Sequence, residues 1–144
     1  MKIAIGNDHA GTEYKLAIEE YLQKEGIEVL NFGTDELDSV DYPDFVHPVA
    51  SRVNDNKVDL GILICGTGNG VAMTANKYEN VRAGLCWNKE IVQLIREHNN
   101  ANILCIPARF TSLAQVIEMV KVYLNTEFLG GRHANRIKKI PLQC

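Results

Sequence analysis

The sequence lacks any long apolar run, any secretory signal and any excess of positive charge. No uninterrupted apolar stretch is longer than that at 62–65, far short of the roughly 20 residues that span a membrane. The amino terminus reaches polar residues by Asn7, without the apolar region of a signal peptide. Fifteen basic residues stand against eighteen acidic ones, a net charge of −3. These absences argue against membrane and nucleic-acid partners and predict a cytoplasmic protein.

Cysteine is scarce and scattered, with four residues at positions 65, 86, 105 and 144. Because no two of them form a CxxC pair, the spacing argues against a zinc site or a redox dithiol and favours free thiols. With 46% hydrophobic and 23% charged residues, the composition is that of a globular protein. The 144 residues fit a single domain, 1–144, whose core is large enough to need no disulfide or metal.

Short β-rich runs alternate with stretches of helical spacing along the chain. The β-rich runs lie at 2–6, 27–32, 58–65, 81–86 and 102–107. Apolar stripes predict helices around 14–22, 45–53, 91–95 and 113–124, and a shorter helix is expected at 70–77. Gly26 marks the end of the first helix, whereas Asn88 and Ser112 are placed to cap the last two. The alternation predicts a three-layer α/β/α Rossmann-like fold whose five-stranded parallel sheet has the common order 2-1-3-4-5.

This strand order places the loops after the first and third strands side by side, where open α/β sheets bind their ligands. The loops contain Asp8 and His9, and Cys65, Gly66, Thr67, Gly68, Asn69 and Gly70. The alternate glycines let several backbone N–H groups converge on one point at a helix start, as in an anion or oxyanion cradle. The loop matches neither a P-loop nor a dinucleotide fingerprint, and a tight turn without a ligand is the alternative.

Cys65 ends a central strand and faces the start of a helix, a setting that stabilises a thiolate. It is therefore a candidate base or nucleophile, and Thr67 is a candidate donor to an oxyanion. The alternative, a buried structural cysteine, suits Cys86 and Cys105 better. Asp8 and its neighbouring histidine could hold sugar hydroxyls or a phosphate, or could equally form a helix start with a solvated imidazole.

His98 and Asn99 lie at the amino edge of the predicted sheet, roughly 20 Å from the Cys65 loop of the same chain. The pair is therefore either structural or part of a site in a partner subunit. Arg109 follows the fifth strand, which the predicted order puts about 10 Å to the side of the third.

The carboxyl-terminal stretch, 130–144, is basic and ends in a small apolar anchor at 140–142. Arg132 and Arg136 are four residues apart and would share a helical face, as a bidentate phosphate clamp requires. A solvated basic tail is the alternative, and packing against a neighbouring subunit is a further interpretation of this stretch.

Six motifs follow one another in order: IGNDHAG near the start, VDYPDF at 40–45, GILICGTGNG at 61–70, ANK at 75–77, REHNNAN at 96–102 and GGRHANR at 130–136. Together they resemble the type B ribose-5-phosphate isomerases, in the family that also holds galactose-6-phosphate isomerase subunits. The resemblance implies interconversion of ribose 5-phosphate and ribulose 5-phosphate through a cis-enediolate. It also implies no metal or organic cofactor, and a homodimer or homotetramer with sites shared between subunits.

Carried over by position, the resemblance implies that Cys65 is the proton-transferring base and that His98 opens the sugar ring. It assigns Asp8, His9, residues 66–70 and Asn99 to sugar binding. It assigns Arg109, Arg132 and Arg136 to further substrate contacts, and their guanidinium groups suit the phosphate.

Three other functions compete with this interpretation. The first is an isomerase of a six-carbon sugar phosphate, such as allose or galactose 6-phosphate. The second is a catalytically silent, sugar-phosphate-binding subunit of a hetero-oligomer, against which the presence of both Cys65 and His98 argues. A nucleotide-binding module is the weakest rival, because the glycine loop fails the known nucleotide motifs.

Overall fold

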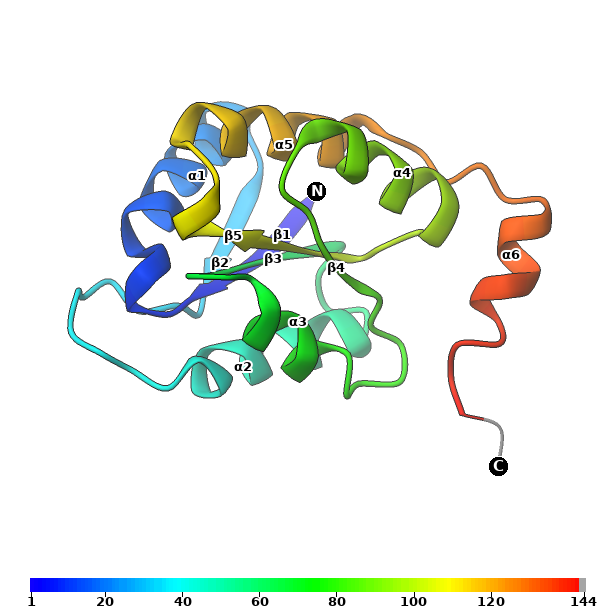
Figure 1. Cartoon of the computed structure of the whole chain (residues 1–144), viewed down its shortest axis with the longest axis horizontal. Coiled ribbons are helices and arrows are strands. Elements are labelled where there is room, and N and C mark those ends of the chain that lie inside the picture. The colour runs from blue at the N-terminus through cyan, green and yellow to red at the C-terminus, as the bar shows by residue number, and fades with distance from the viewer. Residues whose placement is uncertain (143–144) are drawn as a thin grey trace.

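The computed structural model describes residues 1–142, in which a five-stranded parallel sheet lies between two layers of helices (Figure 1). The strands are β1 (Lys2–Asn7), β2 (Glu28–Asn31), β3 (Leu60–Cys65), β4 (Ala83–Leu85) and β5 (Ile103–Pro107). The helices are α1 (Thr12–Lys24), α2 (Tyr42–Asn54), α3 (Asn69–Ala75), α4 (Lys89–Asn99), α5 (Leu113–Asn125) and α6 (Arg132–Ile137), with short 3-10 helices η1 (His9–Gly11) and η2 (Ala108–Phe110). The α/β class with a parallel sheet is thus confirmed.

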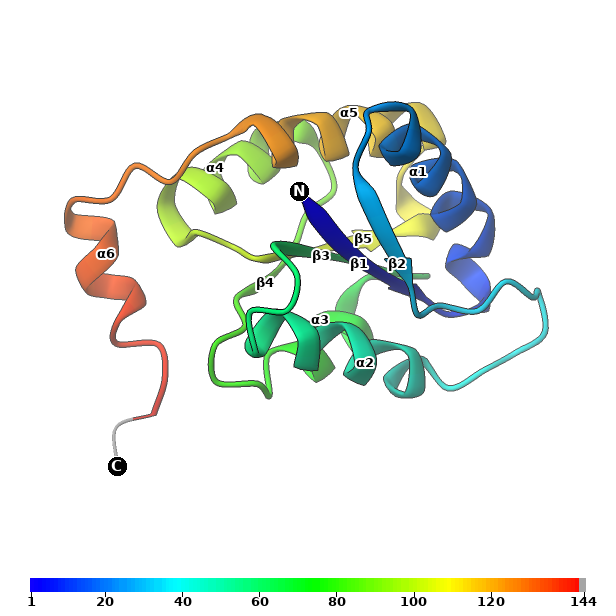
Figure 2. The ribbon, with the colours of Figure 1, turned by 180° about the vertical axis from the view of Figure 1, so that it is seen from behind.

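Each face of the sheet has its own hydrophobic core, because successive side chains of a strand point to opposite faces. Ile62 and Ile64 of β3 pack with the face covered by α1, α4 and α5, as seen in Figure 2. Leu63 and Cys65 pack with the opposite face, covered by α2 and α3. Burial on both sides explains why β3 and β5 are almost uninterruptedly apolar.

The strand order is β2-β1-β3-β5-β4. The predicted order 2-1-3-4-5 is therefore wrong in its last two strands, which are exchanged. β5 pairs directly with β3, while β4 forms the edge. The physical reason lies in burial and length. All five residues of β5 are buried, whereas β4 has three residues of which only the middle one is buried. A short strand is the better occupant of an exposed edge.

Local sequence signals fix the ends of several helices as predicted. The Asn88 side chain accepts a hydrogen bond from the Ile91 N–H at the start of α4. Ser112 and Gln115 form a reciprocal capping box at the start of α5. Gly26 follows α1 with a φ of 75°, a left-handed conformation that glycine adopts without strain.

The carboxyl-terminal stretch leaves the helical layers and carries α6 out to the side of the molecule, next to the end of α4 (Figure 1). The Leu129 N–H donates to the Glu97 carbonyl where the stretch departs. None of the residues of α6 is buried. Packing of this stretch on a second subunit stays a prediction, and Cys144 lies outside the described residues. Of the helices in residues 1–142, none combines the length and apolar character needed to cross a membrane.

Candidate active site

The carboxyl ends of β1 and β3 lie side by side, as the sequence predicts. Asn7 is in register with Ile64, and the Asp8 N–H donates to the Ile64 carbonyl at 3.2 Å. Asp8 and His9 therefore begin their loop directly next to Cys65. The strand pairing alone brings these polar residues together.

The loop after β3 turns tightly around the Cys65 sulfur. Cys65 is 4% exposed, and its Sγ accepts a hydrogen bond from the Gly68 N–H at 3.2 Å. The φ of Gly68 is +74°, and a Cβ there would lie 2.4 Å from the Leu85 Cδ1, so only glycine fits. Thr67 is exposed, and its Oγ1 accepts from the Asn69 N–H. The turn thus places a backbone donor where negative charge on the sulfur would be.

Arg109 lies against this loop rather than about 10 Å to its side, which corrects the expectation from the wrong strand order. The Arg109 N–H donates to the Gly66 carbonyl at 3.0 Å. A Cβ on Gly66 would lie 3.2 Å from the Arg109 guanidinium carbon, so the side chain passes directly over the loop. The direct β3–β5 pairing is what brings a cation next to Cys65.

Tyr42 also covers the loop, and sequence reasoning did not single it out as a site residue. A Cβ on Gly70 would lie 2.5 Å from the Tyr42 Cζ, so the phenol ring packs on the backbone of Gly70. Tyr42 is 38% exposed at the start of α2. The need for a glycine at 70 hints at a close neighbour, but the sequence does not say which residue that is.

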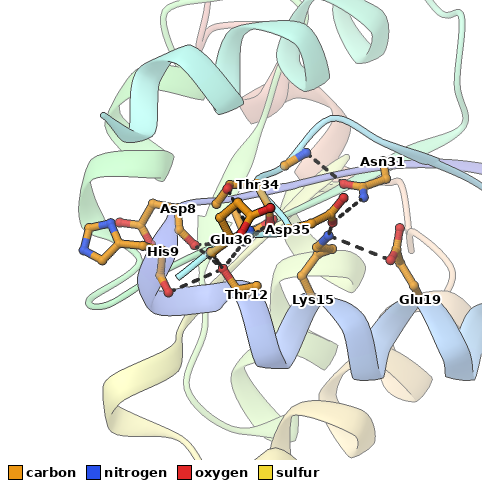
Figure 3. Close-up of polar contacts among 11 residues, drawn as sticks. Asp8, His9, Thr12, Lys15, Glu19, Asn31, Thr34, Asp35 and Glu36 are labelled. Carbon is orange, nitrogen blue, oxygen red and sulfur yellow. Dashed lines mark hydrogen bonds and ion pairs between the residues drawn. The ribbon is translucent and has the colours of Figure 1, made fainter. Parts of the chain in front are cut away.

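The residues Asp8, His9, 65–70 and Arg109 are called the carboxyl-end cluster below. Within it, Asp8 lies beside His9 ahead of α1 (Figure 3). Asp8 is 7% exposed, and its Oδ1 caps η1 by accepting from the Ala10 N–H. The Nδ1 of His9 accepts a hydrogen bond from the Val40 N–H at 3.2 Å. Backbone N–H groups therefore hold both side chains, that of Asp8 from its own turn and that of His9 from a distant segment of the chain.

A second group of predicted residues gathers at the opposite edge of the sheet, near the end of α4. The imidazoles of His98 and His133 stack with ring centroids 4.3 Å apart. Beside them is a pocket of about 360 Å³. Its lining residues are His98, Asn99, His133, Arg136, Ile137 and Ile140. The polar residues His98, Asn99, His133 and Arg136, together with Arg132, are called the tail cluster below. The six-residue length of a strand separates this cluster by roughly 20 Å from Cys65 of the same chain.

Comparison with known proteins identifies the family. A model of the family described as Ribose/Galactose Isomerase matches residues 3–140. This chain belongs to the ribose/galactose isomerase family.

Three relatives illustrate the match. Ribose-5-phosphate isomerase B of Escherichia coli (strain K12) is 40% identical over 139 residues, 96% of this chain and 93% of that protein. The structure of Clostridium thermocellum ribose-5-phosphate isomerase B is 47% identical, with a TM-score of 0.95 over 97% of this chain and 95% of that one. The structure of the Mycoplasma genitalium enzyme with bound ribulose-5-phosphate is 44% identical, with a TM-score of 0.94 over 96% of this chain and 93% of that one. The family, the fold class and the enzyme class expected from the sequence are confirmed.

Cys86 and Cys105, the other two buried thiols of this isomerase-family chain, have raised pKa values. Burial raises the pKa of Cys86 to about 12 and raises the pKa of Cys105 well above its ordinary value. Both therefore stay protonated at neutral pH, in keeping with structural roles. Within residues 1–142, no three His, Cys, Asp or Glu side chains gather closely enough to hold a metal ion.

His133 is a second residue of this isomerase-family chain that sequence reasoning did not select. His133 belongs to the GGRHANR motif, but its stacking on His98 depends on the packing of α6 beside α4. Desolvation lowers the pKa of His133, and the charges of His98, Arg132 and Arg136 lower it further. The charges of the two arginines therefore disfavour protonation of the ring.

Replacing Arg136 with Gln is expected to raise the pKa of His133 part of the way toward its ordinary value. The substitution removes one of the cations that oppose protonation, while the desolvation remains. An NMR titration of the ring protons measures the change. Arg52→Gln, which removes a cation stacked on Phe32 instead, is the matched control and should leave the His133 titration unmoved. An unchanged pKa in Arg136→Gln would contradict the arrangement of the tail cluster.

Proposed function

We propose that this chain interconverts ribose 5-phosphate and ribulose 5-phosphate. The observation that carries the proposal is the Cys65 sulfur, which accepts from the Gly68 N–H inside a glycine loop flanked by Asp8, His9 and Arg109. Such a site brings a proton acceptor, backbone donors and a cation together at one end of the sheet. The names of the relatives, one of them solved with bound ribulose-5-phosphate, support the same substrate.

In this mechanism the cyclic aldose is opened first. His98 moves the proton of the anomeric hydroxyl to the ring oxygen, so that the ring C–O bond breaks and the aldehyde forms. The Cys65 thiolate then takes the proton from C2, and the electron pair moves through a cis-enediolate. The hydroxyl proton of O2 passes to O1, and the Cys65 thiol returns its proton to C1, which gives the ketose. The N–H groups of residues 66–70 and the Thr67 hydroxyl stabilise the negative charge on the oxygens.

The substrate phosphate is held by arginines, whose binding energy aligns the reacting carbons. Because the tail cluster lies roughly 20 Å from Cys65 in one chain, His98, Asn99, Arg132 and Arg136 serve the site of a second copy. Each site uses the Arg109 of the chain that supplies its Cys65, a proposal supported by the packing of Arg109 on Gly66. The active form is therefore a homodimer or a homotetramer.

The purified chain is expected to convert ribose 5-phosphate to ribulose 5-phosphate with a kcat between about 1 and 10³ s⁻¹, the usual range for enzymes. A coupled assay for the ketose measures this turnover. Allose 6-phosphate and galactose 6-phosphate are assayed in parallel and are expected to react much more slowly.

Turnover restricted to a six-carbon sugar phosphate would keep the chemistry and overturn the substrate. No turnover with any of these sugars would overturn the proposal and favour a silent subunit of a hetero-oligomer.

A further inference from the structure

The segment that joins β2 to α2, residues 32–41, passes the start of α1 at Thr34, Asp35 and Glu36 (Figure 3), and residues 35–39 are exposed where it loops out toward α2 (Figure 1). Backbone hydrogen bonds join its first residues to β1, from the Phe32 N–H to the Ile5 carbonyl and from the Thr34 N–H to the Asn7 carbonyl. Four further contacts use side chains between Asn7 and Lys15. They are Asn7 Nδ2 to the Thr34 carbonyl, Thr12 Oγ1 to the Glu36 carbonyl, the Val40 N–H to His9 Nδ1, and the ion pair of Lys15 with Asp35. The same short stretch of chain carries Asp8 and His9.

Lys15 is the unusual member of this set, because its side chain is completely buried. Its ammonium pairs with Asp35, which is 64% exposed, and lies 3.9 Å from the Glu19 carboxylate. Asn31 Nδ2 donates to the same Asp35 oxygen at 3.0 Å. A buried ammonium is costly unless it is paired and hydrogen-bonded, so Lys15 stabilises the conformation in which Asp35 lies over α1. The pKa of Asp35 is lowered chiefly by its hydrogen bond with Lys15, so the Asp35 carboxylate stays ionised at neutral pH.

The far end of the same segment determines the state of the His9 ring. Because the Val40 N–H donates to Nδ1 at 3.2 Å, this nitrogen is an acceptor and carries no proton. The proton of the neutral imidazole is then on Nε2, which becomes a hydrogen-bond donor. Without the Val40 contact, both the ring orientation and the tautomer would be free to vary.

We propose that Lys15 and Asp35 are positioning residues for His9. By holding residues 32–41 on α1, the pair keeps Val40 against the imidazole and so presents a single Nε2–H donor to an oxygen of the sugar phosphate. The identity of that ligand rests on the proposed function; the effect on the ring does not. Neither residue touches the substrate, and both act through Val40 and His9.

The test is Lys15→Met, which keeps an apolar stem in the buried space and removes the ammonium. Asp35 then remains charged but exposed, while the Glu19 carboxylate, 16% exposed, loses its ion pair with Lys15. We expect KM for ribose 5-phosphate to rise about tenfold with kcat within about twofold, because His9 contributes binding that is equal in the ground and transition states. In the ¹⁵N NMR spectrum, the His9 ring should change from a single Nε2–H tautomer to a mixture. The His9 signals are assigned by their loss in His9→Gln.

Glu19→Gln is the matched control. It removes the other carboxylate near Lys15, but Glu19 and Lys15 both lie on α1 and their contact does not hold the segment. KM and the His9 tautomer should stay as in the parent chain. If Lys15→Met fails to fold because Glu19 and Asp35 repel, the double variant Lys15→Met/Glu19→Gln leaves Asp35 as the single charge and serves instead.

The NMR measurement needs no turnover, so it separates this inference from the proposed function. A parent chain that is inactive on every sugar but whose His9 becomes a tautomer mixture in Lys15→Met would overturn the function and keep the positioning role. A Lys15→Met chain that retains the single Nε2–H tautomer and the parent KM would overturn the positioning role.

Discussion

Replacing Cys65 with alanine is expected to lower kcat for ribose 5-phosphate by about 10³-fold, the middle of the range for loss of a general base. Neither of the other two thiols within residues 1–142 can take over, because Cys86 and Cys105 are buried and their pKa values are raised. Steady-state kinetics measures the loss. Exchange of the C2 hydrogen of the sugar with heavy water should stop as well, since it depends on the same proton transfer.

Cys105→Ala is the control for this result, because Cys105 is a fully buried thiol on the same face of the sheet. It should cost about 1 kcal/mol of stability through the small cavity that it leaves. Its kcat should stay within about twofold of the parent value. A Cys65→Ala chain that turns over within tenfold of the parent would show that another group removes the proton.

The site next to Cys65 is the part that sequence reasoning predicted best. Two short apolar strands, each followed by polar and glycine-rich loops, are enough to place Asp8 beside the cysteine once the sheet is taken to be parallel. The position of Arg109 could not be obtained in the same way. Its distance depends on whether β4 or β5 pairs with β3, and both strands are short apolar runs in the sequence. Only their relative burial in the folded chain separates the two orders.

Contacts between segments far apart in the sequence could not be predicted from local sequence patterns, for a similar reason. Lys15 is a charged residue next to the apolar stripe of α1, and nothing in the helical period marks it as buried. The segment after β2 passes beside it and brings Asp35 to it as a partner. The stacking of His133 on His98 likewise joins segments 35 residues apart. The sequence predicts which residue types are available, whereas the fold decides which of them meet.

The separation of the two clusters makes the strongest prediction about assembly. A chain with Cys65→Ala and a chain with His98→Gln should each be nearly inactive alone, the second by about 10²-fold for loss of a proton-transfer group. With two different affinity tags, mixed dimers of the two chains can be purified after co-expression. If each site takes Cys65 from one chain and His98 from the other, one of the two sites in the mixed dimer has both groups intact. Its activity should be about half that of the parent dimer, since a two-fold symmetric dimer has two equivalent sites.

The reciprocal mixture makes this result decisive. A mixed dimer of a parent chain with a Cys65→Ala/His98→Gln chain carries the same two substitutions, but now every shared site lacks one group. It should be nearly inactive, whereas sites contained within one chain would leave the parent half working and give about half activity. The two mixed dimers have the same composition of side chains and differ only in how these are distributed. Half activity in the reciprocal mixture, with none in the first, would show that Cys65 and His98 of one chain act together across the sheet, against the roughly 20 Å that separates them.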